Sequence, residues 1–367
     1  MINTTYYQDL TKMNTFGMKV KARCFIEYDS VADLVDIEFG ELARPVLHIG
    51  GGSNLLFTDD FKGTILHSKI NFIEILDDCH FDRASDCHFD RAERVEKSVG
   101  PVLVSVGAGV VFDDFCDWAA KECLWGVENL SYIPGEVGAS AVQNIGAYGV
   151  EVKDVIKTVY CYDTIEEEFV NFDVEDCEYG YRDSVFKDPE IKGRYIVTHV
   201  VFALSRTPQP NLDYAHLKEM VLSSASDEKS LTPAMVRKVI IRIRKEKLPE
   251  PSVTGSAGSF FKNPVITAEH FARIEAAAKA ESGPDYKVPH YDLPDGTVKV
   301  PAAWMIEQCG WKGKRSGGAA VWEKQPLVIV NYTGEAYPEE IVGLEKRIIS
   351  SVKTKFDVEL HPEVEHI

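Results

Sequence analysis

The chain of 367 residues contains no uninterrupted apolar run long enough to span a bilayer. Its first residues also lack the basic region followed by an apolar stretch that marks a secretory signal. There are eight cysteines but no Cys-x-x-Cys pair, a pattern that favours reduced, mostly buried thiols over a disulfide framework. We therefore expect a cytoplasmic globular protein that makes no membrane contact.

Positive charge is scarce: 40 Lys and Arg stand against 58 Asp and Glu, which gives a formal net charge of −18. Proteins that bind nucleic acid present a basic face, so nucleic acid is not an expected partner. A ligand that bears phosphate would need a local basic patch working against the overall field. The predicted helix 233–247 carries such a concentration of basic residues, although a charge run is by default a solvated helical face.

The two most familiar nucleotide-binding motifs are missing. There is no G-x-x-x-x-G-K-[ST] P-loop, and the run Gly50-Gly51-Gly52-Ser53-Asn54 lacks the third glycine of a G-x-G-x-x-G fingerprint. A glycine turn between two strands can still direct several N–H donors at a phosphate. A longer stretch, 133–149, holds four glycines and one charge, Glu136, so a ligand can approach its main chain. A single glycine-rich stretch favours tight turns, and it is the presence of two that favours a cofactor cradle.

Hydrophobic periodicity predicts the remaining elements. Amphipathic helices are expected over 112–122, 233–247 and 339–356, and a capped helix is expected to begin at Ser30. Apolar runs predict strands at 24–28, 63–67, 102–107, 158–162, 195–202 and 327–330. Residues 248–251, Leu-Pro-Glu-Pro, predict a linker to a separate α/β domain in the last third of the chain.

Residues 78–84 and 86–92 repeat one seven-residue sequence. The repeat brings Cys79, His80, Cys87 and His88 close in sequence, and these are residue types that bind zinc. Adjacent Cys-His pairs are poorly suited to closing a tetrahedral site, and the spacing matches no known finger. We expect a solvated insertion in a hairpin loop, and no metal.

Six segments are together specific enough to indicate a family. They resemble segments of the UDP-N-acetylenolpyruvoylglucosamine reductase family, occur in that family's order and extend over nearly the whole chain. They are Asn-Thr-Phe-Gly at 14–17, Gly-Gly-Gly-Ser-Asn-Leu-Leu at 50–56, the glycine-rich stretch at 133–149, Gly-Tyr-Arg-Asp-Ser-x-Phe-Lys at 180–187, Gly-Ser-Ala-Gly-Ser-Phe-Phe-Lys-Asn-Pro at 255–264, and Pro-Glu-Val at 362–364.

This resemblance implies an α+β fold. Two subdomains, 1–70 and 71–245, would form an FAD-binding scaffold of the vanillyl-alcohol-oxidase or PCMH type. An α/β domain, 246–360, would bind the substrate, and 361–367 would return to the active site. FAD is expected to be non-covalent because the glycine loop has no histidine to tether it.

The resemblance also implies the reaction. NADPH would reduce the flavin, and hydride would then pass to UDP-N-acetylenolpyruvoylglucosamine to give UDP-N-acetylmuramate, a peptidoglycan precursor. Such an enzyme is expected to act as a monomer.

Hydride addition to an enol ether develops charge beside the carboxylate, and this charge has to be stabilised before a proton is delivered. By similarity, Ser259 would be the general acid, and Arg182 and Glu363 would polarise the substrate carboxylate, with Glu363 protonated for that role. Without the surrounding motif, the chemistry of Ser259 favours a turn hydroxyl, and that of Arg182 fits a salt-bridge partner equally well.

The resemblance implies further contacts in two groups. FAD would be held by Gly50, Gly51, Gly52, Ser53, Asn54, Pro134, Gly135, Ser140, Gln143, Asn144, Gly146, Ala147, Tyr148 and Gly149. The substrate would be bound by Tyr181, Tyr214, Lys247, Asn263 and Gln308, with Lys262 as a second-line residue. Tyr214 would place the chain in the tyrosine-loop (type I) subtype.

Two other functions are compatible with parts of the pattern. A different FAD-dependent oxidoreductase on the same scaffold accounts for both glycine stretches, but not for 255–264 together with Glu363. A regulator that only binds a UDP-sugar would be expected to have lost Ser259, Arg182 or Glu363, yet all three are present.

Overall fold

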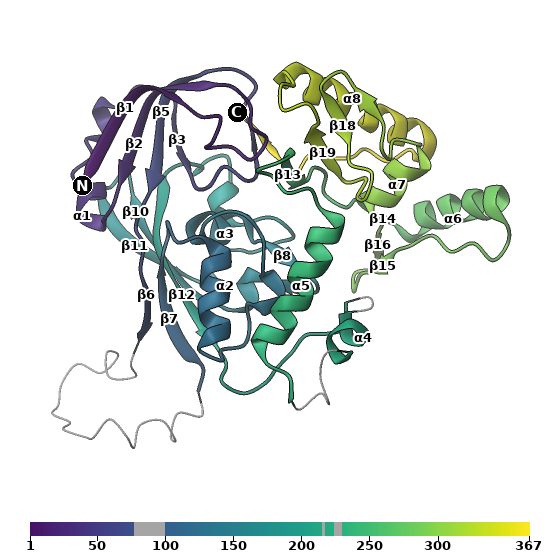
Figure 1. Cartoon of the computed structure of the whole chain (residues 1–367), viewed down its shortest axis with the longest axis horizontal. Helices are drawn as coiled ribbons and strands as arrows, with labels where there is room; N and C mark the ends of the chain where they lie inside the picture. The colour runs from purple at the N-terminus through teal and green to yellow at the C-terminus, as the bar shows by residue number, and fades with distance from the viewer. Residues whose placement is uncertain (77–99, 215–216, 224–229) are drawn as a thin grey trace. The chain divides into compact units, whose positions relative to one another are not determined.

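The computed structural model describes residues 1–76, 100–214, 217–223 and 230–367, so the repeated sequence at 78–92 lies outside the described residues. The chain forms two compact units (Figure 1). The first comprises Met1–Gln8, Ala22–Gly51 and Lys62–Arg244, and the second comprises Asp9–Lys21, Gly52–Phe61 and Lys245–Ile367. The second unit therefore combines the last third of the chain with two short N-terminal segments.

One sheet of the first unit is built from the N-terminal strands. Their order across the sheet is β1 (Ile2–Asp9), β2 (Lys21–Tyr28), β5 (Phe61–Ser68) and β3 (Val46–Ile49). The strands β3 and β5 are parallel, with Ile49 opposite His67. Helix α1 (Val31–Val35) begins after Ser30, whose side chain accepts a hydrogen bond from the Asp33 N–H, as predicted.

The second sheet of this unit is antiparallel. Its order is β11 (Glu168–Asp173), β10 (Ile156–Asp163), β12 (Tyr195–Leu204), β7 (Val102–Gly107) and β6 (Ile73–Leu76). Helix α2 (Phe112–Lys121) contributes its apolar face to the core of this layer. The buried residues of α2 are those that the periodicity predicted: Phe112, Phe115, Cys116, Ala119 and Ala120.

Helix α5 (Pro233–Lys247) has the predicted bounds and runs beside α2 (Figure 1). Its basic face is not simply solvated. Arg237 is only 9% exposed, and its Nη1 and Nη2 donate to the Asp113 carboxylate of α2 at 2.5 and 3.1 Å. Arg244 donates through Nε to the Tyr132 carbonyl at 3.0 Å, and burial lowers its pKa. The default expectation of a solvated face is therefore wrong for these two residues, because acidic α2 supplies a partner for Arg237 and the Tyr132 carbonyl supplies one for Arg244, and the local sequence reveals neither.

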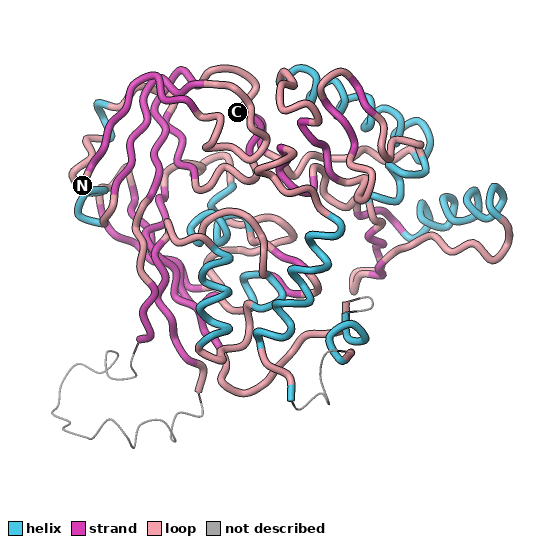
Figure 2. The backbone as a smooth tube through the Cα atoms, viewed as in Figure 1, coloured by secondary structure: helices cyan, strands magenta, loops and turns pink. Residues whose placement is uncertain are grey.

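The two larger sheets of the second unit have four and three strands (Figure 2). One has the order β13 (Gly255–Ser259), β19 (Val328–Asn331), β18 (Ala319–Val321) and β17 (Arg315–Ser316), and it packs with α8 (Pro338–Phe356). The other belongs to a β-α-β-β segment made of β14 (Val265–Thr267), α6 (Ala268–Ser282), β15 (Tyr291–Asp292) and β16 (Thr297–Lys299). Helix α7 (Ala302–Gln308) follows β16.

Two further observations concern the described residues alone. Cys24, Cys116, Cys161 and Cys177 are free and buried, which agrees with the expectation from the cysteine pattern. No helix in these parts of the chain is long and apolar enough to cross a membrane.

The segment 14–17 has a structural role within the second unit. The Thr15 N–H donates to the Gly52 carbonyl at 3.1 Å, and the Thr15 carbonyl accepts from the Ser256 N–H at 2.9 Å. The Phe16 carbonyl accepts from Nδ2 of Asn331 at 3.0 Å. The segment therefore joins the end of the first glycine loop to β13, and so connects two motifs that lie 200 residues apart in sequence.

We expect Gly52→Ala to destabilise this junction by about 2–4 kcal/mol. Gly52 has a φ of 59°, and a Cβ at this position would lie 2.0 Å from the Met13 carbonyl oxygen, so the main chain would have to move. Urea denaturation measures the change in the free energy of unfolding. Gly40→Ala is the matched control, because a Cβ at Gly40 meets nothing within 4 Å. Equal stability of the two variants would contradict the expected strain.

Candidate functional site

The two glycine stretches come together in the first unit. A Cβ built on Gly50 would lie 3.1 Å from the Cβ of Ala139 and 3.2 Å from the Glu136 carboxylate. A Cβ on Gly51 would lie 3.5 Å from the Cα of Gly135. The bare main chain that follows β3 thus lies directly against the bare main chain of 135–139. The sequence predicted the two stretches separately, and the fold joins them into one cradle.

Part of the second stretch is a helix, α3 (Val137–Gln143), where bare loop or tight turns were expected. It packs closely because its residues are small: a Cβ on Gly138 would lie 2.9 Å from the Cβ of Ala108. The Gly138 N–H donates to the Ala108 carbonyl at 2.9 Å. The sequence did not indicate this helix, because five of its seven residues are small or polar and give no clear amphipathic period.

A tight hairpin ends the stretch. Strands β8 (Gly146–Ala147) and β9 (Val150–Glu151) are antiparallel, and Tyr148 and Gly149 between them have φ values of 49° and 81°. Two central residues with positive φ define a type I′ turn, which matches the twist of the strands. The predicted cofactor residues 146–149 therefore form one strand and the turn of a single hairpin.

An unpaired donor lies in this region. Nε2 of Gln143 is buried and has no hydrogen-bond partner within the described part of the chain, while its Oε1 accepts from Lys187 Nζ at 3.1 Å. A buried amide without a partner is costly, so a ligand acceptor is the natural complement. Main-chain N–H groups, an unpaired amide and close-packed glycines suit a large polar cofactor with a planar ring, and these residues fit FAD.

Arg182 belongs to a loop that is fixed onto the cradle. Its Nη1 donates to the Asn144 carbonyl at 3.2 Å and its Nη2 to the Gly146 carbonyl. The Ser184 hydroxyl donates to the Val142 carbonyl at 2.6 Å, and Lys187 Nζ donates to the Arg182 carbonyl at 2.9 Å. The sequence supplied Lys187 within a motif but gave it no role. Here it braces both Arg182 and Gln143.

In the second unit, the residues that follow Ser259 are hydrogen-bonded to the C-terminal segment that carries Glu363. Ser259 ends β13 opposite Val328, after a bulge in which Gly258 has a φ of 69°. The Glu363 N–H donates to the Phe260 carbonyl at 2.8 Å, and the Lys262 N–H donates to the His361 carbonyl at 2.9 Å. The last residues of the chain thus run antiparallel to 260–262, beside the exposed Ser259.

The same tail is held on its other side by the end of the glycine loop. Nδ2 of Asn54 donates to the Glu363 carbonyl at 3.0 Å, and β20 (Glu365–His366) pairs in parallel with β4 (Leu55–Leu56). Nε2 of His366 lies 3.1 Å from the Glu345 carboxylate of α8. The side chain of Asn54, a predicted cofactor residue, therefore supports the segment that carries Glu363.

Other predicted residues have mixed surroundings. Asn263 accepts the Ala302 N–H through Oδ1 at 2.9 Å, and Lys247 is exposed. Tyr214 is 40% exposed, and its ring packs edge-on against Tyr148 with centroids 5.5 Å apart. The Ser140 hydroxyl donates to the Val137 carbonyl at 2.7 Å within α3.

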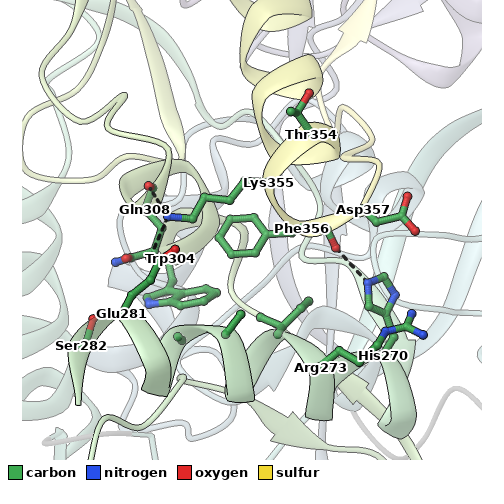
Figure 3. Close-up of a pocket in the computed structure, with 13 residues that line it drawn as sticks. His270, Arg273, Glu281, Ser282, Trp304, Gln308, Thr354, Lys355, Phe356 and Asp357 are labelled. Atoms are coloured by element: carbon green, nitrogen blue, oxygen red, sulfur yellow. Dashed lines mark hydrogen bonds and ion pairs between the residues drawn. The ribbon is translucent and has the colours of Figure 1, made fainter. Parts of the chain in front are cut away.

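Gln308 lines a cavity of about 450 Å³ between α6, α7 and α8 (Figure 3). The rings of Trp304 and Phe356 lie 5.3 Å apart in it. Lys355 Nζ bonds to the Glu281 carboxylate at 3.2 Å and to the Gln308 carbonyl at 3.3 Å. None of the other predicted substrate residues lines this cavity.

Comparisons with known proteins agree with this organisation. Residues 22–164 match the FAD binding domain family, and 250–367 match the C-terminal domain of UDP-N-acetylenolpyruvoylglucosamine reductase. A solved MurB from Thermus caldophilus is similar in fold, with a TM-score of 0.61 and 21% identity, covering 100% of this chain and 98% of that one. The predicted α+β FAD-binding scaffold with a C-terminal domain of this family is confirmed.

Curated relatives are similar over almost the whole chain. A UDP-N-acetylenolpyruvoylglucosamine reductase from Bacteroides fragilis is 46% identical, covering 98% of this chain and 98% of the relative. Those from Porphyromonas gingivalis and Neisseria meningitidis are 42% and 43% identical, covering 98% of this chain and 97% and 96% of the relatives. The chain belongs to the UDP-N-acetylenolpyruvoylglucosamine reductase family.

Proposed function

We propose that the chain catalyses the NADPH-dependent, FAD-mediated reduction of UDP-N-acetylenolpyruvoylglucosamine to UDP-N-acetylmuramate, in peptidoglycan precursor synthesis. The chain belongs to a family of oxidoreductases, and its relatives are named UDP-N-acetylenolpyruvoylglucosamine reductase. The structural observation that carries the proposal is the hydrogen bonding of 260–262 with the C-terminal tail, which holds the backbone of Glu363 against Phe260, the residue after Ser259.

The glycine cradle of the first unit is the proposed FAD site. Main-chain N–H groups of Gly50 and Gly51 and the unpaired amide of Gln143 are donors suited to the polar parts of the cofactor. Gly146 to Gly149 supply one strand and the turn of a hairpin, free of charge. The chemistry that FAD supplies when bound is hydride transfer, from NADPH to the enolpyruvyl group.

Three side chains are proposed to stabilise the charge that develops on the substrate and to deliver the proton. Two nitrogens of the Arg182 guanidinium donate to main-chain carbonyls, which fixes the orientation of the side chain. A guanidinium has five N–H donors in all. Together with Glu363 it would stabilise the charge that develops beside the substrate carboxylate. Ser259 would deliver the proton to the adjacent carbon.

The remaining assignments follow the same proposal. Lys247 and Asn263 would contact the diphosphate, with Tyr181, Tyr214 and Gln308 completing the substrate contacts and Lys262 in a secondary position. The tyrosine-loop subtype is supported by the edge-on packing of the Tyr214 ring against Tyr148, which gives that ring a defined position. Division of FAD and substrate binding at residue 246, a monomeric state and a cytoplasmic location stay predictions.

Product identification tests the proposed function. Purified protein, NADPH and UDP-N-acetylenolpyruvoylglucosamine are expected to yield a product whose mass increases by that of a hydride and a proton. With deuterated NADPH in ordinary water, the mass increase shows whether hydride reaches the product. Unchanged substrate together with oxidised NADPH would contradict the proposal and indicate a different oxidoreductase on this scaffold.

The state of the cofactor is tested separately. Acid precipitation is expected to leave the yellow colour in the supernatant, because the FAD is proposed to be non-covalent. Colour that stays with the precipitate would contradict this expectation.

A further inference from the structure

His67, in β5, has a carboxylate opposite each ring nitrogen. Nε2 lies 3.0 Å from Oε1 of Glu136, and Nδ1 lies 3.2 Å from Oε1 of Glu27. The side chain of His67 is 6% exposed and that of Glu136 is 12% exposed, so water does not compete freely. An ionised carboxylate only accepts hydrogen bonds, and neutral imidazole has one N–H. Satisfying both contacts therefore requires the imidazolium form.

The other groups around this cluster fix its charge. Lys69 Nζ lies 3.4 Å from Oε1 of Glu27. His48, on the neighbouring strand β3, is held neutral, because burial lowers its pKa to about 3, and it hydrogen-bonds to the Tyr28 hydroxyl at 2.7 Å. Two carboxylates, one ammonium and one imidazolium sum to zero. Loss of the His67 proton leaves the cluster with one negative charge.

Glu136 carries this charge into the cradle. It is the one charged residue of the stretch 133–149. Its carboxylate oxygens lie 3.2 Å from a Cβ built on Gly50 and 3.9 Å from a Cβ built on Gly51. An unneutralised carboxylate here would oppose the binding of an anionic cofactor. We therefore expect such a ligand to bind the loop more tightly while a cation faces Glu136.

We propose that protonated His67 neutralises Glu136 behind the glycine loop and thereby sets the affinity of the protein for FAD and the pH dependence of that affinity. His67 acts through Glu136 and is a positioning residue, not a catalytic one. The inference rests on the FAD site proposed above.

The sign of the pH dependence follows from the cluster. Burial favours neutral His67, but the hydrogen bonds and charges of Glu136 and Glu27 outweigh it and raise the pKa of His67 above 6.5. FAD is an anion, so it binds best when His67 is protonated. Affinity is therefore expected to fall as the pH rises through the titration of His67, at a pH above 6.5, by roughly tenfold.

Titration of apoprotein with FAD, followed by flavin fluorescence between pH 6 and pH 9, measures the dissociation constant. Glu136→Gln is expected to flatten the pH dependence and to retain FAD affinity at high pH. Glu27→Gln is the matched control, because Glu27 faces the other ring nitrogen and not the loop. It should shift the fall in affinity to lower pH but preserve it.

His67→Gln should weaken FAD binding below the titration of His67, to the level that the parent protein reaches above it, and adding Glu136→Gln should restore the affinity. Circular dichroism at each pH confirms that every variant is folded. An unchanged pH profile in folded Glu136→Gln would overturn the inference. Gly51→Val distinguishes failure of the role proposed for His67 from failure of the proposed cofactor site. If Gly51→Val leaves FAD binding intact, the proposed site is wrong. If it abolishes binding while the profile of Glu136→Gln is unchanged, only the role of His67 is wrong.

Discussion

Replacing Ser259 with alanine is expected to lower the rate of substrate reduction by about 10²–10⁴-fold, the usual contribution of a general acid. Reduction of the bound flavin by NADPH should be unchanged, because that half-reaction needs no proton from Ser259. The position supports this role: Ser259 is exposed at the end of β13, after a bulge that turns the chain, and beside the tail that carries Glu363.

Anaerobic stopped-flow absorbance at the flavin band measures the two half-reactions separately. Ser252→Ala is the control, since Ser252 is an exposed serine seven residues earlier in the chain whose hydroxyl donates to the Glu250 carboxylate at 3.4 Å. Equal losses in both half-reactions of Ser259→Ala, with the FAD content unchanged, would remove Ser259 as the acid. A fall confined to flavin reduction would have the same consequence.

Replacing Glu363 with alanine is expected to slow the same half-reaction by about 10²–10³-fold, the range for loss of one group that stabilises a developing oxyanion. The backbone of Glu363 is held from both sides, by Phe260 and by Asn54. Truncation of the side chain should therefore leave the tail in place. Glu363→Gln keeps a hydrogen-bond donor and is expected to recover part of the rate.

The control for this pair is Glu365→Ala, a glutamate on the same tail whose main chain pairs with β4. It should behave like the parent protein in both half-reactions. If Glu363→Ala retains the full rate of substrate reduction, or if Glu365→Ala loses as much, the assignment to Glu363 fails. Thermal denaturation of each variant shows whether the tail is still docked.

Local sequence predicted the long helices and several of the longer strands. The apolar spacing of α2 gave its buried face residue by residue, and α5 and α8 begin and end within a residue of their predicted bounds. These helices bury one stripe against a core, so periodicity carries the information. The capped start of α1 was visible for the same reason, because its signal is confined to Ser30 and Asp33.

Contacts between distant segments were not visible. The helix α3 has no apolar period, and its packing depends on how closely Gly138 approaches Ala108. The pairing of 260–262 with 361–363 joins segments about a hundred residues apart, and nothing in either sequence specifies the other. The burial of Arg237 depends on Asp113, which a local charge count cannot supply.

In the candidate site too, local features could be predicted from the sequence and contacts between distant segments could not. The glycine stretches were recognisable because bare main chain is a local property, whereas their contact through Gly50 and Ala139 is tertiary. The role of Lys187 and the link between His67 and Glu136 emerged only from the structure.

The measurement that tests the central claim most directly is NADPH oxidation by the purified yellow protein under anaerobic conditions, with and without UDP-N-acetylenolpyruvoylglucosamine. Without substrate, we expect NADPH oxidation to stop once the bound flavin is reduced. With substrate, oxidation should continue through many turnovers, in proportion to the substrate added. Flavin reduction with no turnover in the presence of that substrate would retain the FAD site but contradict the proposed reaction.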